Sequence, residues 1–187
     1  MTVCGYELIR SKRKTMGISV KLDGSVIVRA PLRAPSADIE RFVEANRDWI
    51  FRQQAKMEKV SAEASREKAF TQEEIREMAE KALQIIPPSV EHFARLIGVT
   101  YGKITIRNQK SRWGSCSSKG NLNFNCLLVL APPEVLDSVV VHELCHRKEM
   151  NHSPAFYAEV LRVLPDYHKH DQWLKKNGPV LIMRMTG

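Results

Sequence analysis

The sequence predicts an α+β fold in which a small mixed or antiparallel sheet packs against one buried helix. Alternating apolar residues flank Asp23-Gly24, a dipeptide typical of a tight hairpin turn, and predict strands within residues 6–30. Alternation returns in three short segments between residues 103 and 125 and predicts further strands. The helix expected after Pro132-Pro133 is apolar on more than one side, which is typical of a helix buried among other elements.

Residues 1–60 are predicted to form a β-hairpin followed by a helix. Pro31 and Pro35 end the strands, and Ser36 is expected to cap the helix because its hydroxyl can accept a hydrogen bond from the first turn. Residues 59–69 are polar and alanine-rich, so they either continue the helix on the surface or form a linker. The apolar positions of the helix recur at helical spacing: Ile39, Phe42, Val43, Trp49, Ile50 and Met57.

Residues 70–187 are expected to form the larger core region, and the two regions together one compact unit. Thr71 and Glu74 have the spacing of a capping box, which predicts that a helix begins there. Pro87-Pro88 predicts a break in that helix, because proline lacks the backbone N–H and clashes with the preceding turn. A second, short helix is then expected to close at Gly98.

The chain is basic. It has 187 residues, 43% of them hydrophobic, and a net charge of +8, so it can bury the core of one ordinary domain. Residues 1–60 carry twelve Lys/Arg against seven Asp/Glu, residues 61–100 five against seven, and residues 101–187 twelve against seven. A basic surface favours nucleic acid, nucleotides or acidic protein as partners. A generally basic surface without such a partner explains the composition equally well.

The sequence predicts a cytoplasmic protein with no membrane partner. It contains no run of ~18 apolar residues that could form a transmembrane helix. Residues 1–10 lack the basic start and the long apolar run of a signal peptide. The four cysteines show no paired spacing, and we expect reduced thiols at Cys4, Cys116, Cys126 and Cys145.

Residues 142–146 read His-Glu-Leu-Cys-His, the HExxH arrangement of metal-dependent hydrolases. His142 and His146 are four residues apart, so on a helix both imidazoles can reach one zinc ion. Glu143 is rotated roughly 80° from that face, at ~100° per residue. It is therefore expected to hold the water at an open zinc position rather than to bind the metal.

His152 is the expected third ligand. Asn151 tolerates the left-handed conformation that ends a helix, while Ser153 and Pro154 suit the first positions of the next helix. His152 would then occupy a tight corner from which it can turn back to the other two histidines. Three imidazoles plus one water is a standard catalytic zinc set. Glu149 and Glu159 remain alternative third ligands, Cys145 is expected to be a small packing residue, and a chance HExxH is the competing interpretation.

Several segments together resemble the YgjP-like metal-dependent hydrolases, and the resemblance covers nearly the whole chain. The N-terminal segments that carry it are Ser11–Lys14, Val28–Pro31 and Trp49-Ile50. The other segments that carry it are Ser111–Cys116, Asn121–Asn125, Pro132, Val140–His146, Asn151–Ser153 and Phe156, and the block from Arg112 to His152 is specific to the family.

This resemblance implies a zincin-like fold related to the SprT- and Wss-type proteases, which digest proteins crosslinked to DNA. It implies that His142, His146 and His152 bind zinc and that Glu143 is the general base. The spacing of the histidines also resembles the metzincins, but Glu149 stands where those enzymes have glycine, so the chain is not placed among them. Members of the resembled family are described as proteases and as nucleoside-triphosphate pyrophosphatases.

We interpret the chain as a zinc-dependent hydrolase and favour a metallopeptidase acting on a protein or peptide, with nucleic-acid-associated proteins among the candidates. One alternative is a zinc-dependent nucleoside-triphosphate pyrophosphatase acting on nucleotides. A second is a basic nucleic-acid-binding protein with a structural metal site. A peptide could add as a strand beside residues 112–116. The candidate substrate-binding residues are Arg112, Trp113, Lys119 and Arg147, and the candidate oxyanion donors are Tyr157 and Tyr167.

Overall fold

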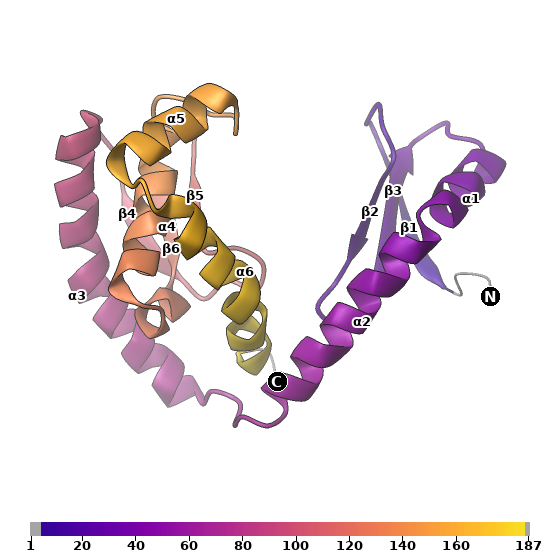
Figure 1. The fold of residues 1–187 in the computed structure, drawn as a ribbon, viewed down its shortest axis with the longest axis horizontal. Coiled ribbons are helices and arrows are strands. Elements are labelled where there is room, and N and C mark those ends of the chain that lie inside the picture. Colours follow the sequence, from indigo (N-terminus) through magenta and orange to yellow (C-terminus); the bar gives the residue numbers. More distant parts are fainter. Residues whose placement is uncertain (1–4, 186–187) are drawn as a thin grey trace. The chain divides into compact units, whose positions relative to one another are not determined.

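A computed structural model describes residues 5–185, which form an α+β protein with two small mixed sheets and six α-helices (Figure 1). The predicted fold class is confirmed. The chain divides into two compact units, one up to Glu67 and one from Lys68 onward. Within the described residues, no helix is long and apolar enough to cross a membrane. Cys4 lies outside the described residues.

The first unit contains a three-stranded sheet of order β1-β3-β2, built from β1 (Tyr6–Ser11), β2 (Gly17–Val20) and β3 (Val26–Pro31). Strand β1 is parallel to β3, whereas β2 is antiparallel to it. The predicted hairpin between β2 and β3 is thus confirmed. Its turn contains Gly24 at φ +80°, a conformation that glycine adopts without steric cost.

Two helices follow, α1 (Ser36–Ala45) and α2 (Arg47–Ala64), where the sequence predicted one. They separate at Asn46, whose side-chain amide donates to the carbonyl of Phe42. The prediction that Ser36 is the N-cap of the first helix is also wrong, because Pro35 occupies the N-cap position of α1 and Ser36 is already helical. The core of this unit combines β3 with both helices and comprises Val26, Val28, Ala30, Ile39, Val43 and Ile50.

The second unit begins with the long helix α3 (Gln72–Ile97). The capping box of Thr71 and Glu74 is present as predicted, but the predicted break at Pro87-Pro88 is wrong, since the helix runs through both prolines. Ile86 and Val90 on either side are fully buried, so tertiary packing holds the helix together across the prolines. The carbonyls that lose their N–H partners belong to exposed residues, where water can replace the missing hydrogen bonds.

The second sheet has the order β4-β6-β5 and consists of β4 (Ile104–Arg107), β5 (Gly114–Cys116) and β6 (Leu122–Asn125). Strand β4 is parallel to β6, and β5 is antiparallel to it, so the predicted 113–125 hairpin is confirmed. Strand β5 is therefore an edge strand with one unpaired side. The buried Asn125 amide ties the chain before β5 to β6 by donating to the carbonyls of Gln109 and Arg112.

Helix α4 (Pro133–Cys145) is the centre of this unit (Figure 1). The 3₁₀ helix η1 (Cys126–Leu130) precedes it, and α5 (Pro154–Val163) and α6 (Tyr167–Arg184) follow it. Helix α4 packs against α3, η1, β5, α5 and α6. Its many apolar faces are therefore all used, as the sequence predicted for a buried helix. Its fully buried residues include Val140, Val141, Leu144 and Cys145.

Candidate metal centre

Helix α4 and the turn after it position the three histidines. His142 lies in the last turn of α4, and His146 is the C-cap residue, because the helix ends at Cys145. His152 follows a short turn, directly before α5. The N-cap role predicted for Ser153 is confirmed, since its hydroxyl accepts from the Phe156 N–H. The left-handed conformation predicted for Asn151 is wrong, because no described residue other than glycine has positive φ.

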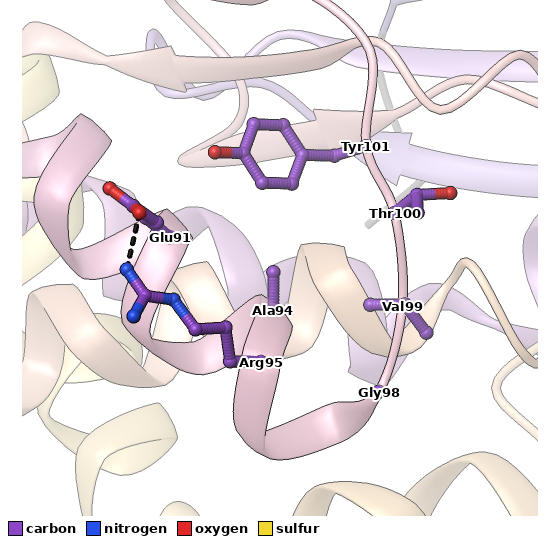
Figure 2. A pocket seen from close by; sticks show the side chains of 7 residues that line it. All are labelled: Glu91, Ala94, Arg95, Gly98, Val99, Thr100 and Tyr101. Atoms are coloured by element: carbon purple, nitrogen blue, oxygen red, sulfur yellow. Dashed lines mark hydrogen bonds and ion pairs between the residues drawn. The ribbon is translucent and has the colours of Figure 1, made fainter.

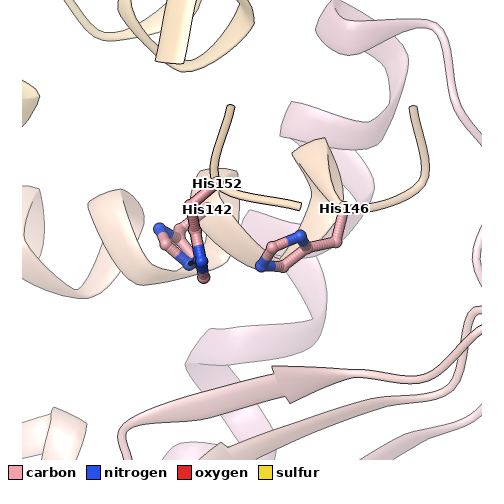
Figure 3. Close-up of side chains that lie close together, drawn as sticks. All are labelled: His142, His146 and His152. Atoms are coloured by element: carbon pink, nitrogen blue, oxygen red, sulfur yellow. Dashed lines mark hydrogen bonds between the residues drawn. The ribbon is translucent and has the colours of Figure 1, made fainter. Parts of the chain in front are cut away.

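The three imidazole rings converge on one point (Figure 3). Nε2 of His142 lies 3.0 Å from Nε2 of His152, and ring nitrogens of all three histidines lie within 4.8 Å of one another. Among residues 5–185, no other group of three or more potential metal ligands is found. The buried ring of Phe156 packs against all three imidazoles, with centroid distances of 4.6–4.9 Å. The histidines are thus held together by a shared apolar contact.

Hydrogen bonds to the far side of two rings set their orientation. Nδ1 of His146 donates to the carbonyl of Glu149 at 3.0 Å, which leaves the Nε2 lone pair of His146 available for a metal. Nδ1 of His142 lies 2.8 Å from the hydroxyl of Tyr167 on α6. Tyr167 was a candidate oxyanion donor, but its hydroxyl contacts His142 instead. Its role as an orienting residue has no signal in the sequence, since it lies 25 residues from His142.

The electrostatics of the cluster fit a metal site. Burial, together with the neighbouring His146 and His152, lowers the pKa of His142 to about 4. Burial is also the main cause that lowers the pKa of His146. Both imidazoles are therefore neutral near pH 7, the form in which histidine binds a metal. Three imidazole nitrogen donors, with His152 exposed to solvent, match the donor set of an open, catalytic zinc site.

Glu143 lies beside this cluster and is only 6% exposed. Burial raises the pKa of its carboxyl group to about 8, against the opposing effects of the Arg112 charge and of the Cys116 backbone N–H, which donates to the carboxylate. Strand β5 therefore contacts Glu143 directly. The contact is close, because a Cβ atom on Gly114 would lie 2.7 Å from both Cγ and Oε1 of Glu143.

A cavity of about 190 Å³ opens next to Glu143 and His142. It lies between β5, α4 and α6. Aromatic and aliphatic side chains form much of its wall, and two carboxylates, those of Glu143 and Asp171, face it. The residues that line it are Trp113, Gly114, Ser138, Val139, His142, Glu143, Tyr167, Asp171 and Leu174. The histidine cluster thus has an adjoining space that can receive part of a substrate.

Comparison with known families shows the family to which this chain belongs. A family model described as "YgjP-like, metallopeptidase domain" matches residues 14–78 and 65–177. The chain belongs to the YgjP-like family. As a member, it is a metallopeptidase and hence a metal-dependent hydrolase of peptides, with a site of three histidines. A comparison with curated proteins found no significant match.

The YgjP-like chain also resembles two solved archaeal metallopeptidase zymogens. Abylysin from Pyrococcus abyssi is 25% identical, with a TM-score of 0.45, over 49% of this chain and 94% of abylysin. Jannalysin from Methanocaldococcus jannaschii is 21% identical, with a TM-score of 0.44, over 49% of this chain and 95% of jannalysin.

The four residues predicted to bind substrate occupy different places in the YgjP-like chain. Trp113 lines the cavity, and the charge of Arg112 acts on Glu143. Lys119 lies in the exposed turn between β5 and β6. Arg147 packs over Gly120, and its guanidinium donates to the carbonyls of Thr100 and Ser118. The contacts of Arg147 therefore hold two loops together.

The alternative third ligands lie outside the histidine cluster. The Glu159 carboxylate binds Lys148 and Arg162, at 2.6 and 2.5 Å, so its charge is already compensated. Glu149 contributes its backbone carbonyl to His146, and its own side chain is exposed. Cys145 is fully buried, and burial raises the pKa of its thiol to about 12, which suits the packing role expected for it.

A second hollow, of about 410 Å³, lies at the C-terminal end of α3 (Figure 2). An ion pair between Glu91 and Arg95 crosses one side of it, and Tyr101 stands opposite. Both charged side chains of this hollow are thus paired with each other, and none of the three histidines lines it. The chemistry of a hydrolase is concentrated in the smaller cavity next to Glu143.

Proposed function

We propose that the protein is a zinc-dependent metallopeptidase in which His142, His146 and His152 bind the metal and Glu143 is the general base. The observation that carries the proposal is the convergence of three imidazoles beside one buried carboxylate. Zinc is favoured because it suits imidazole ligands and an open fourth position. When bound, zinc supplies Lewis-acid activation of a water molecule and of the substrate carbonyl.

Glu143 supplies the proton transfers in this proposal. Because burial raises its pKa to about 8, its ionised form is a stronger base than a surface carboxylate, and this ionised form accepts the proton of the attacking water at Oε1 or Oε2. The same group then delivers the proton to the leaving amine. The Cys116 N–H and the backbone of Gly114 hold the carboxylate in place during both steps. Tyr167 keeps the His142 ring in the orientation that directs Nε2 into the cluster.

The unpaired side of β5 is the proposed binding surface for the peptide backbone. In the antiparallel pair with β6, the Trp113 carbonyl and the Ser117 N–H bond towards the partner strand. Alternate residues of an antiparallel strand direct their backbone groups to opposite sides, so those of Gly114 and Cys116 face away from β6. The Cys116 N–H already donates to Glu143, so a peptide that adds as a strand to this edge would bond to the Gly114 backbone and lie next to Glu143.

The two alternatives have less support from the site. A pyrophosphatase would use basic side chains as phosphate clamps, but Arg147 is engaged with two backbone carbonyls. A purely structural metal site would normally be closed by a fourth protein ligand. Among the described residues the cluster has three ligands, and it adjoins a cavity.

A nucleic-acid-associated substrate has one supporting feature. Residues 10–36 carry seven Lys/Arg and a single acidic residue, Asp23. Most of these cations lie on one end of the first sheet, where β1 and β3 end and β2 begins. We propose this end as the surface that binds a phosphate backbone. The proposal requires that binding to a DNA duplex weaken steeply with salt, and salt-independent or undetectable binding would refute it.

Hydrolysis of defined substrates tests the function. Zinc-loaded protein is incubated in parallel with a peptide library, with casein and with a panel of nucleoside triphosphates, and Glu143→Gln serves as the matched control. We expect peptide cleavage that the control lacks, and no pyrophosphate release. Release of pyrophosphate without peptide cleavage would establish the alternative function, and the same activity in both proteins would exclude this site as its source.

A further inference from the structure

The cavity beside Glu143 has a largely apolar lining and the size of a pocket for one side chain. Trp113, Val139 and Leu174 provide its apolar surface. These residues come from the chain before β5, from α4 and from α6, so three separate segments enclose the space. Its volume, about 190 Å³, has room for several water molecules and hence for one amino-acid side chain.

The polar groups of the cavity differ in how far they are already engaged. The Ser138 hydroxyl donates to the carbonyl of Val135, and the Tyr167 hydroxyl contacts His142. The described structure gives the Asp171 carboxylate one ion-pair partner, Lys175, at 2.5 Å from one of its two oxygens. Glu143 also faces the cavity but is the proposed general base, so Asp171 is the carboxylate that remains for binding an entering group.

Lys175, the ion-pair partner of Asp171, would compete only weakly with a cation that enters the cavity. Lys175 lies one helical turn away, and its side chain is 71% exposed. Exposed ion pairs at this spacing contribute little, because water screens them and a long side chain must be fixed. A cation that enters the cavity would meet the same carboxylate in a less hydrated place, where the attraction is stronger. The effect of the Asp171 charge already reaches both His142 and Tyr167.

Contact with α6 holds Trp113 in position at this cavity. Trp113 packs against Gly178 of α6, where an added Cβ atom would lie 2.8 Å from Cζ2 of the indole. Gly178 is itself buried. The absence of a side chain at this position lets the indole of Trp113 pack directly against α6.

We propose that this cavity selects substrates with a lysine or arginine next to the scissile bond, and that Asp171 is the specificity-determining residue. The proposal rests on the proposed peptidase function and names its substrate class. The aliphatic part of a long basic side chain packs along Trp113, Val139 and Leu174, as such stems commonly do. The cationic end meets the carboxylate of Asp171, and a single acidic group in a pocket is sufficient to set such a preference.

Peptides that differ at one position test this assignment. The series carries lysine, norleucine or glutamate beside the scissile bond. Calorimetry measures how tightly each peptide binds to the zinc-loaded Glu143→Gln protein, which cannot cleave it. The protein with Glu143 intact is then used to measure the cleavage rate of each peptide. Lysine should be favoured over norleucine by roughly 10- to 100-fold, the range for a hydrogen bond to a charged group. Asp171→Asn should abolish that preference, so that lysine and norleucine peptides bind equally and are cleaved at the same rate. Asp166→Asn is the matched control, since Asp166 lies just before α6, pairs with Lys169 and does not line the cavity.

The two readouts separate this inference from the function on which it rests. Equal binding of lysine and norleucine peptides, or a preference that survives Asp171→Asn, overturns the specificity assignment while leaving the peptidase intact. A failure to cleave any peptide overturns the proposed function, and calorimetry with the uncleaved peptides then decides the inference by itself. Gly178→Ala gives a second check, because displacing Trp113 should weaken binding of lysine and norleucine peptides alike.

Discussion

Gly114 and Glu143 approach each other so closely that no side chain fits between them. A Cβ atom at position 114 would lie 2.7 Å from Cγ and from Oε1 of Glu143 and 3.0 Å from Cδ. The edge strand β5 thus contacts the proposed general base through Gly114, and glycine is the one residue type without a side chain. Together with the N–H of Cys116, this contact fixes the carboxylate beside the histidine cluster.

Gly114→Ala should destabilise the protein and lower its activity. The backbone at position 114 does not have positive φ, so alanine fits the local conformation and the clash with Glu143 is the cause of the effect. We expect a loss of about 1–3 kcal/mol in the free energy of unfolding, the usual range for overpacking. Urea denaturation measures it. In a Glu143→Ala background the same substitution should cost close to nothing, and an undiminished cost would show that the contact is not the reason.

Glu143→Gln should retain the metal and lose hydrolysis. The amide occupies the same volume but cannot accept a proton from water, so the rate should fall by roughly 10²- to 10⁴-fold. Metal content is measured by elemental analysis and activity with the best peptide. A variant that keeps more than a tenth of the activity would assign the base to another group.

Tyr167→Phe should weaken metal binding without unfolding the protein. Its hydroxyl contacts Nδ1 of His142, and removing such an orienting contact typically costs 10- to 100-fold in metal affinity. Tyr157→Phe is the matched control, because Tyr157 stacks near His152 and no hydrogen bond joins it to a histidine nitrogen in the described structure. Competition with a chelator of known affinity measures both. Equal effects of the two substitutions would contradict the role given to Tyr167.

Glu159→Gln should lower stability in a pH-dependent way. Hydrogen bonds from Arg162 and Lys148 lower the pKa of Glu159 from 4.5 to about 2 in the folded protein. A carboxyl whose folded pKa is lowered stabilises the fold above its unfolded pKa and loses that contribution as the pH falls towards the folded value. The variant should therefore be less stable by about 1 kcal/mol at pH 7, a surface-screened amount. The difference should fade between pH 4.5 and 2, and a constant difference across this range would exclude the ion pairs as its source.

Local sequence patterns predicted those parts of the structure that depend on local contacts. The capping box of Thr71 and Glu74 and the N-cap of Ser153 were confirmed, because a cap is decided within four residues. The convergence of the three histidines was also predictable, since one helical turn and a short corner bring them together. The prolines at 87 and 88 show the limit of this approach. Their local preference for a helix break yields to the burial of α3 against η1 and α4.

Sequence patterns could not predict contacts between segments that lie far apart in the sequence. Tyr167 reaches His142 only because α6 packs on α4, and Gly114 reaches Glu143 only because β5 packs on the same helix. Arg147 has the charge of a phosphate clamp in the sequence, whereas in the fold it binds the carbonyls of two loops. In each case the packing of whole elements decides the role of the residue.

Metal stoichiometry tests the central claim most directly. Elemental analysis of the zinc-reconstituted and dialysed protein should give one zinc per chain, and His142→Ala, His146→Ala and His152→Ala should each lose most of it. Arg147→Ala, whose side chain lies outside the cluster, should keep the full amount if it remains folded by circular dichroism. Zinc that is absent from the unaltered protein, or retained in all three histidine variants, would contradict the assignment of these residues as the metal site.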